Sequence, residues 1–437
     1  MTLTATWENY KSLPNADNVT RTTLSNGIVV LLRRNPHSSS IALAGYVPAG
    51  SAHDPVEKLG LADFVARALK YGTQQYDFNQ IYSLLESCGA NLGFSGSTHN
   101  TNFSGRALSE DLPMMLGLLR QALEQPTFPE QEVDMLRDQL LTGLQIRAQD
   151  TRAIAAINFD RMMYGDTHPY GRPSDGFIET VQAITTEDLR AFHQAHYGPR
   201  GMVVAVTGNI DPSATIATLE TALGDWHNPD QAEELEISVP EPLVEPQRMD
   251  AEIADKFQTD LVMGTPGPNR NSPDYLTAIL GNNILGQFGL MGRIGDVVRD
   301  QAGLAYHAST TLNATSISGV WEVVAGVNPG NLNRAIDLIQ SELERFRTTK
   351  VEAEELADSR ANLIGRLPIS LESNAGVAYL LLRIERFDLG LNYLQDYIQT
   401  LNAATAEDIQ DVAARYINFD QLVISSAGPA RESETAE

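Results

Sequence analysis

Apolar residues recur with a helical period near the start of the chain, after two stretches whose patterns are typical of strands. In GLADFVARALKYGT (residues 60–73), Leu61, Phe64, Val65, Ala68 and Leu69 fall on one helical face. Apolar runs at 28–33 and 41–47 are typical of strands, and the turn-forming NPHS separates them. Further helices are predicted at 79–86, 113–124, 129–148 and 154–164. Because helices and strands mix without βαβ alternation, the pattern predicts an α+β fold with helices covering a mostly antiparallel sheet.

A unit of the first half recurs in the second. Residues 185–208 resemble residues 405–428, and each stretch opens with the helix-capping signature Thr-x-x-Asp. Each continues as an amphipathic helix and ends in a strand, at 202–206 and at 422–425. An offset of about half the chain favours a duplicated domain over coincidence. We therefore expect two homologous α+β domains.

The length of 437 residues exceeds what one hydrophobic core normally supports. Residues 227–250 are rich in proline and acidic side chains and lack apolar periodicity, so they are typical of an extended linker. The predicted organisation is an N-terminal domain at 1–226, a linker at 227–250 and a C-terminal domain at 251–437.

Composition narrows the class of protein. A net charge of −25 argues against nucleic-acid binding, because a polyanion would be repelled. One cysteine, Cys88, excludes an intrachain disulfide and a thiolate zinc cluster. No apolar run has the length of a membrane span, and the N-terminus lacks the pattern of a signal peptide. These features favour a cytoplasmic protein.

Asp63, Ala66 and Arg67 fall on the opposite face of the 60–73 helix. Residues at i, i+3 and i+4 are those that bring two imidazoles and a carboxylate to zinc in an H-x-x-E-H helix. Here they hold an acid, a methyl group and a cation, and a guanidinium offers no electron pair to zinc. Two interpretations remain open: an ordinary acid–base helix pair, or a zinc site that has lost its ligands. In either case we expect Asp63 and Arg67 to form an ion pair.

The C-terminal half carries a second candidate group. A glycine-rich segment at 286–292, with Gly286, Gly289 and Gly292, follows a helix at 275–284 whose start Ser272 and Pro273 indicate. It lacks the features of a phosphate-binding loop. A helical pattern at 290–299 and a strand at 304–309 follow, so Arg299 and Tyr306 could fold together to grip a peptide carbonyl or an oxyanion. The alternative is an Arg near a helix end and a half-buried Tyr.

With these motifs the chain resembles the pitrilysin/insulinase family of zinc metallopeptidases, in the two-domain branch that includes the mitochondrial processing peptidase. The resemblance extends nearly end to end, through GLADFVARALKYGT, ESCGANLGFSGSTHNTNF, HPYGRP, SPDYLTAILGNNILG and RDQAGLAY. It implies that active members bind zinc through G-x-x-H-x-x-E-H, whose positions match Asp63, Ala66 and Arg67. The family's third ligand, a glutamate, matches Gly143. The family's arginine and tyrosine that contact substrate match Arg299 and Tyr306.

The resemblance implies a non-catalytic, substrate-binding subunit of a heterodimeric zinc endopeptidase that cleaves unfolded peptides. This chain would hold no cofactor; a paralogous partner with the H-x-x-E-H helix would supply zinc, while Arg299 and Tyr306 act in trans. The peptide would add to an exposed sheet edge. The residues expected at that edge are Ser97, Thr98, His99, Asn100, Thr101, Asn102 and Phe103. The alternatives are a structural or assembly subunit and a homodimeric peptide-binding module.

Overall fold

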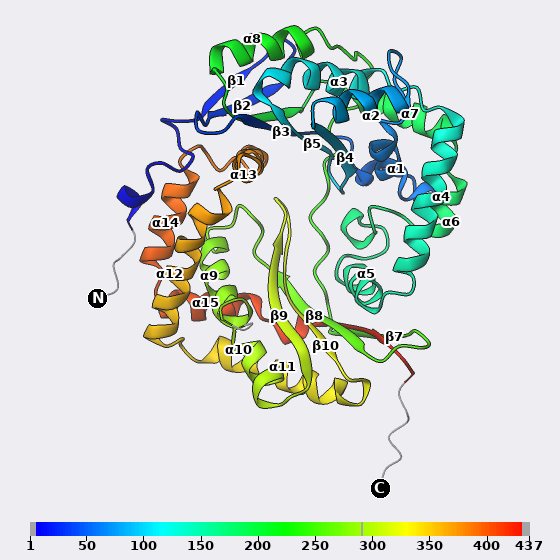
Figure 1. Cartoon of the computed structure of the whole chain (residues 1–437). Helices are drawn as coiled ribbons and strands as arrows, with labels where there is room; N and C mark the ends of the chain where they lie inside the picture. Colours follow the sequence, from blue (N-terminus) through cyan, green and yellow to red (C-terminus); the bar gives the residue numbers. More distant parts are fainter. Residues whose placement is uncertain (1–5, 290–291, 431–437) are drawn as a thin grey trace.

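The computed structural model describes residues 6–289 and 292–430, and its helices and strands form two halves, each with one sheet (Figure 1). The first sheet has the order β1-β2-β6-β3-β5-β4, and the second has the order β7-β11-β8-β10-β9. Each sheet is antiparallel except for one parallel pair, β2 with β6 and β7 with β11. The predicted α+β class with mostly antiparallel sheets is confirmed.

The first half contains six strands and eight α-helices within its described residues. Its strands are β1 (Thr20–Thr23), β2 (Val29–Arg34), β3 (Ser40–Val47), β4 (Asn91–Gly96), β5 (Thr101–Leu108) and β6 (Val203–Gly208). Its helices are α1 (Leu61–Ala68), α2 (Phe78–Ser87), α3 (Leu112–Glu124), α4 (Glu130–Arg147), α5 (Thr151–Tyr164), α6 (Ile178–Ala183), α7 (Thr186–His196) and α8 (Pro212–Leu223).

The second half is built in the same way. Its strands are β7 (Gln247–Glu252), β8 (Thr259–Gly267), β9 (Ala305–Ala314), β10 (Gly319–Val327) and β11 (Val423–Gly428). Its helices are α9 (Tyr275–Gly286), α10 (Gly292–Gly295), a π-helical turn (Asp296–Gln301), α11 (Leu332–Thr348), α12 (Ala353–Ser370), α13 (Asn374–Arg386), α14 (Tyr393–Ala403) and α15 (Ala406–Tyr416).

The repeated unit occupies equivalent places in the two halves. Thr185 and Asp188 form a capping box at the start of α7, and Thr405 and Asp408 form the same box at the start of α15. The strands that follow, β6 and β11, each pair in parallel with one neighbour and antiparallel with the other. Apart from β1, the two sheets have the same order and directions, which supports the predicted duplication.

Two local expectations differ from the structure. Residues 227–246 contain no helix or strand, as expected of a linker, but β7 begins at Gln247 because this segment pairs with β11. The helix expected at 275–284 is observed at Tyr275–Gly286, but its N-cap residue is Asp274 and not Ser272. The Ser272 hydroxyl accepts a hydrogen bond from the Asp274 N–H, which holds this segment in a turn before the helix.

The predicted helix at 290–299 is replaced by two short elements. Residues 290 and 291 lie outside the described part of the chain, and α10 and the π-helical turn follow them. Because a π-helical turn inserts an extra residue per turn, side-chain directions along this segment depart from the α-helical period.

Each sheet is covered on one face by helices of its own half and on the other by a helix of the opposite half. On the first sheet, Val377, Ala378 and Leu381 of α13 pack against buried residues that include Leu31 and Ala205. On the second sheet, Ala155, Phe159 and Met163 of α5 pack against residues that include Val262 and Val423. Figure 1 shows α13 beneath the first sheet and α5 beside the second. The halves therefore share their cores through exchanged helices.

Polar contacts fix the starts of both exchanged helices. The Thr207 hydroxyl of β6 donates to the Asn374 carbonyl at 2.5 Å, and the Asn374 amide donates to the Ser40 carbonyl at 3.0 Å. The Thr151 hydroxyl at the start of α5 donates to Asp260 of β8 at 2.5 Å.

Within residues 6–289 and 292–430, no helix is long and apolar enough to cross a membrane.

Truncation of Leu381 tests the exchange. Leu381 is fully buried, so Leu381→Ala should destabilise the chain by about 2–5 kcal/mol through lost burial and a residual cavity. Because α13 joins the two halves, we expect both to unfold in one denaturant transition of lower midpoint. Ile369→Ala, at an exposed position of α12, is the control and should change stability by about 0.5 kcal/mol or less. A Leu381→Ala variant that loses only one half in a separate early transition would contradict the shared core.

Candidate functional site

Helix α1 packs against β4, at one edge of the first sheet, and almost all of the helix is buried. The Asp54 carboxylate accepts hydrogen bonds from the N–H groups of Gly60 and Ala62, at 2.8 and 2.9 Å, and so caps the helix start. Burial raises the pKa of Asp54 to about 7. The predicted apolar stripe is buried as expected, but Asp63 and Ala66 on the opposite face are buried too, with exposed fractions of 4% and 0%. Helix α1 is therefore packed on both faces.

Asp63 and Arg67 form the predicted ion pair. Arg67 Nε lies 2.7 Å from one Asp63 carboxylate oxygen, and the other oxygen accepts the Gly96 N–H at 3.0 Å. Burial raises the pKa of Asp63 despite the opposing effect of Arg67, because the side chain has little contact with water. The Arg67 side chain is about half exposed.

These residues do not fit a zinc ion. Of the helix positions, only Asp63 carries a donor atom, and both of its oxygens are engaged. Gly143 on α4 is exposed and contributes no side chain. Across residues 6–289 and 292–430, no three His, Cys, Asp or Glu side chains form a group that could hold a metal ion.

At the end of the first sheet nearest α1, the edge strand is β4 and not the expected segment Ser97–Phe103. Of the seven residues Ser97–Phe103, the first four form a turn in which the Ser97 N–H donates to the Asn100 carbonyl. The last three begin β5, which β3 pairs on its other side, with Thr101 opposite Val47. The expectation that Ser97–Phe103 form a sheet edge was wrong, because the pairing of β5 with β3 joins residues about fifty positions apart in the sequence. The edge strand is Asn91–Gly96, and it passes so close to α1 that a Cβ on Gly96 would lie 2.6 Å from the Asp63 Cα.

The turn after β4 contacts a later segment of the same half of the chain. His99 Nε2 lies 2.8 Å from the Tyr170 hydroxyl. Burial, assisted by the nearby Arg386 charge, lowers the pKa of His99 to about 4, so its imidazole is neutral at pH 7. His99 therefore serves as a hydrogen-bonding group without charge.

No hydrogen bond joins Arg299 and Tyr306 among the described residues. Arg299 lies in the π-helical turn, and its Nε is 3.8 Å from an Asp300 carboxylate oxygen. Tyr306 lies on β9, the edge strand of the second sheet, and is 83% exposed. The half-buried alternative for Tyr306 is therefore wrong. Both side chains have room to meet a ligand.

The glycine-rich segment packs closely against β9. A Cβ on Gly286 would lie 2.4 Å from the Thr310 N, so only glycine allows this approach at the end of α9. Gly289 and Gly292 have positive φ angles of 64° and 63°; residues 290–291 between them lie outside the described residues. The segment thus has a packing role that the sequence alone did not identify.

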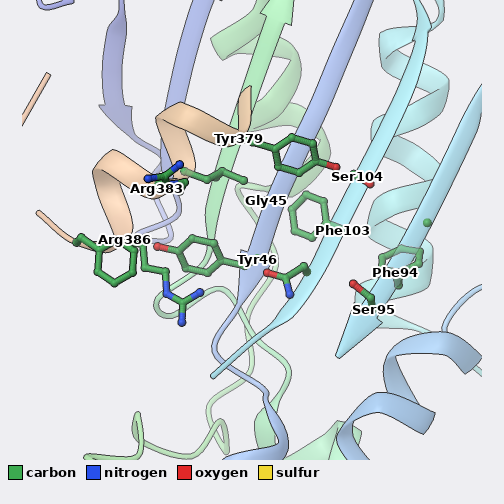
Figure 2. Close-up of a pocket in the computed structure, with 13 residues that line it drawn as sticks. Gly45, Tyr46, Phe94, Ser95, Phe103, Ser104, Tyr379, Arg383 and Arg386 are labelled. Carbon is green, nitrogen blue, oxygen red and sulfur yellow. The ribbon is translucent and has the colours of Figure 1, made fainter. Parts of the chain in front are cut away.

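Sequence reasoning missed a cavity beside β4. It has a volume of about 530 Å³ and lies between α13 and strands β3, β5 and β4, with Arg383 and Arg386 among its lining residues (Figure 2). The only signal in the sequence is the i, i+3 spacing of the two arginines, which places them on one side of a helix. It could not show that this side faces the first sheet, because that depends on the helix exchange.

Comparisons with known proteins agree with this architecture. The model of the insulinase family (peptidase family M16) matches residues 29–168, and that of the peptidase M16 inactive domain matches residues 183–363. Together the two matches cover more than half of the chain.

Relatives and solved structures match along nearly the whole length. An uncharacterized zinc protease of Streptomyces coelicolor is 23% identical over 430 residues, covering 96% of this chain and 91% of that protein. A probable mitochondrial-processing peptidase subunit beta of Schizosaccharomyces pombe is 23% identical, covering 93% and 90% of the two chains. The crystal structure of a peptidase M16 inactive domain from Pseudomonas fluorescens is 26% identical, with a TM-score of 0.86, covering 95% of this chain and 100% of that one. The chain belongs to the insulinase family of peptidases, family M16.

Proposed function

We propose that the chain is a non-catalytic, substrate-binding subunit of a zinc endopeptidase. The observation that carries the proposal is the Asp63–Arg67 ion pair, which takes the positions of the family's zinc-binding side chains and leaves no donor atom free. A paralogous partner with an intact H-x-x-E-H helix would bring the zinc ion and the general base. The names of the relatives, zinc protease and processing peptidase, support peptide hydrolysis as the activity of the pair.

In this proposal, the chain binds and orients an unfolded peptide. An extended peptide would pair with the outer side of β4, which is an edge strand of its sheet, at positions before Gly96, whose N–H is already bound to Asp63. Arg299 and Tyr306 would approach the peptide carbonyl in the assembled pair as hydrogen-bond donors. Their exposure supports this role, because neither side chain contributes to a core. Donors aimed at a developing oxyanion lower the barrier to peptide hydrolysis. The proposed setting is the cytoplasm.

The central test uses this chain with a zinc-motif paralogue of the same organism. We expect neither zinc nor cleavage of an unfolded peptide from this chain alone, and cleavage by the mixture. Arg299→Ala and Tyr306→Phe in this chain should each lower kcat/KM of the pair by roughly 10- to 1,000-fold if they stabilise the oxyanion. Peptide cleavage and zinc content are the measurements.

Arg334→Ala is the matched control, because Arg334 is an exposed arginine on α11. It should leave the activity of the pair unchanged. Cleavage by this chain alone with one zinc ion per chain would disprove the proposal. A pair whose activity is insensitive to both site variants would instead support the role of an assembly subunit.

Loss of Arg67 tests whether the ion pair stabilises α1. Arg67→Ala leaves the Asp63 carboxylate buried with only the Gly96 N–H, and should cost about 1–2 kcal/mol near pH 8, given the partial exposure of Arg67. Arg67 lowers the pKa of Asp63, so its removal raises that pKa further above the unfolded value. A raised carboxyl pKa costs stability as pH rises through it, so the loss should be smaller at pH 5 than at pH 8.

The second variant in this test is Asp63→Asn combined with Arg67→Ala. An amide oxygen can still accept the Gly96 N–H without a buried charge, so the double variant should recover stability at pH 8 and lose the pH dependence. Denaturant unfolding at the two pH values measures both effects. Equal destabilisation at pH 5 and pH 8 would show that the Arg67 contribution is not electrostatic.

A further inference from the structure

A groove crosses the inner face of the first sheet, between α13 and the strands near the β4 edge. The 530 Å³ cavity adjoins a second of about 230 Å³, and Tyr379 and Ser104 line both. The groove follows β5 from Asn102 to Arg106, a length of about 14 Å at the usual rise of a strand. It exists because α13 packs mainly on β6 and β3, which leaves the β5 and β4 side of this face open. This length suits about five residues of an extended chain.

Three arginines line the groove, and none of them has a carboxylate partner within the described residues. They are Arg106 on β5 and Arg383 and Arg386 on α13, and all three are exposed. Several other arginines form ion pairs with carboxylates, for example Arg21 of β1 with Glu385 of α13 at 2.7 Å. No Asp or Glu is among the described residues that line either cavity. The chain has 56 acidic and 31 basic side chains, so composition does not explain a groove whose charged lining residues are all arginines.

The remaining lining groups suit a ligand in which an anionic group lies next to an apolar residue. Figure 2 shows Tyr379, Arg383 and Arg386 of α13 across from Tyr46, Phe103 and Ser104 of the sheet. Burial raises the pKa of Tyr46 to about 12, so its hydroxyl remains a neutral hydrogen-bonding group. Neighbouring protein lowers the pKa of Arg386, although its side chain is exposed. A carboxylate there would accept bidentate hydrogen bonds from the guanidinium.

We propose that this groove binds an extended peptide segment through its carboxylates, with Arg106, Arg383 and Arg386 as the anion-binding groups and the aromatic side chains as the apolar contact. The inference rests on the proposed function in taking the ligand to be a peptide. Acidic side chains and a free C-terminus both present such carboxylates, and the binding assay distinguishes the two sources. A nucleic acid is disfavoured because the net charge of −25 repels a polyanion.

The test measures binding by this chain alone, without a partner. The probe is a fluorescein-labelled peptide of about eight residues that contains two Glu and one Phe among Ser and Ala, followed by fluorescence anisotropy. Replacing both Glu by Gln, or amidating the C-terminus, tells which carboxylate is bound; at least one change should weaken binding by about tenfold. Raising the salt concentration from about 0.05 to 0.5 M should also weaken it.

Matched variants assign the effect to the groove. Arg386→Gln and Arg383→Gln should each weaken binding by about fivefold or more, and Arg383→Lys by less, since it keeps the charge. Arg334→Gln makes the same charge change on α11, outside the groove, and should leave the affinity unchanged. An unchanged thermal midpoint confirms that each variant is folded.

Two results would overturn the inference: equal affinity for the acidic peptide and for its amidated Gln counterpart, or equal affinity in Arg386→Gln, Arg383→Gln and Arg334→Gln. Because this assay needs no partner and no zinc, its outcome is separate from the cleavage test. Arginine-dependent binding with an inactive pair would overturn the proposed function alone, and an active pair with charge-independent binding would overturn this inference alone.

Discussion

The exchange of helices between the halves is the constraint on which the rest of the structure depends. Each sheet has two faces to remove from water, and the helices of its own half cover only one. Helix α13 supplies the second face of the first sheet, and α5 supplies the second face of the second sheet. The halves cannot separate without exposing both buried faces, so their relative orientation is set by core packing. This orientation places Arg383 and Arg386 opposite the β4 edge.

Helix α1 shows how packing sets the requirements of a buried polar position. Position 63 is buried beneath the close approach of β4, so any polar side chain there needs partners inside the protein. Arg67 and the Gly96 N–H supply them, and the Asp54 carboxylate fixes the helix start. The ion pair thus satisfies the burial requirement of a position whose surroundings are set by the fold.

Sequence reasoning was accurate where the deciding interactions are local. The Asp63–Arg67 pair spans four residues, and the capping boxes at Thr185 and Thr405 span three, so spacing alone predicts them. The duplicated organisation followed from such local units. The β4 edge could not be predicted in this way, because pairing of β5 with β3 joins residues far apart in the chain.

The same reason explains the other differences. The helix exchange brings α13 to strands more than 150 residues earlier, and no local pattern records that contact. Arg299 lies beside Asp300 in the π-helical turn before β9, and no hydrogen bond to Tyr306 is seen among the described residues. The role of the groove arginines could not be predicted from the sequence, because it depends both on the strand order of the sheet and on the helix that crosses the sheet.

The shared cores also bear on how the chain is made. During synthesis, β6 completes the first sheet at Gly208, but α13 ends at Arg386, roughly 180 residues later. At about 5–20 residues per second, this interval is on the order of 10 to 40 s. Throughout it, the apolar face formed by Leu31, Ala44, Val203 and Ala205 lacks the helix that covers it in the finished protein. The first half therefore acquires its full buried core only when the second half is nearly complete.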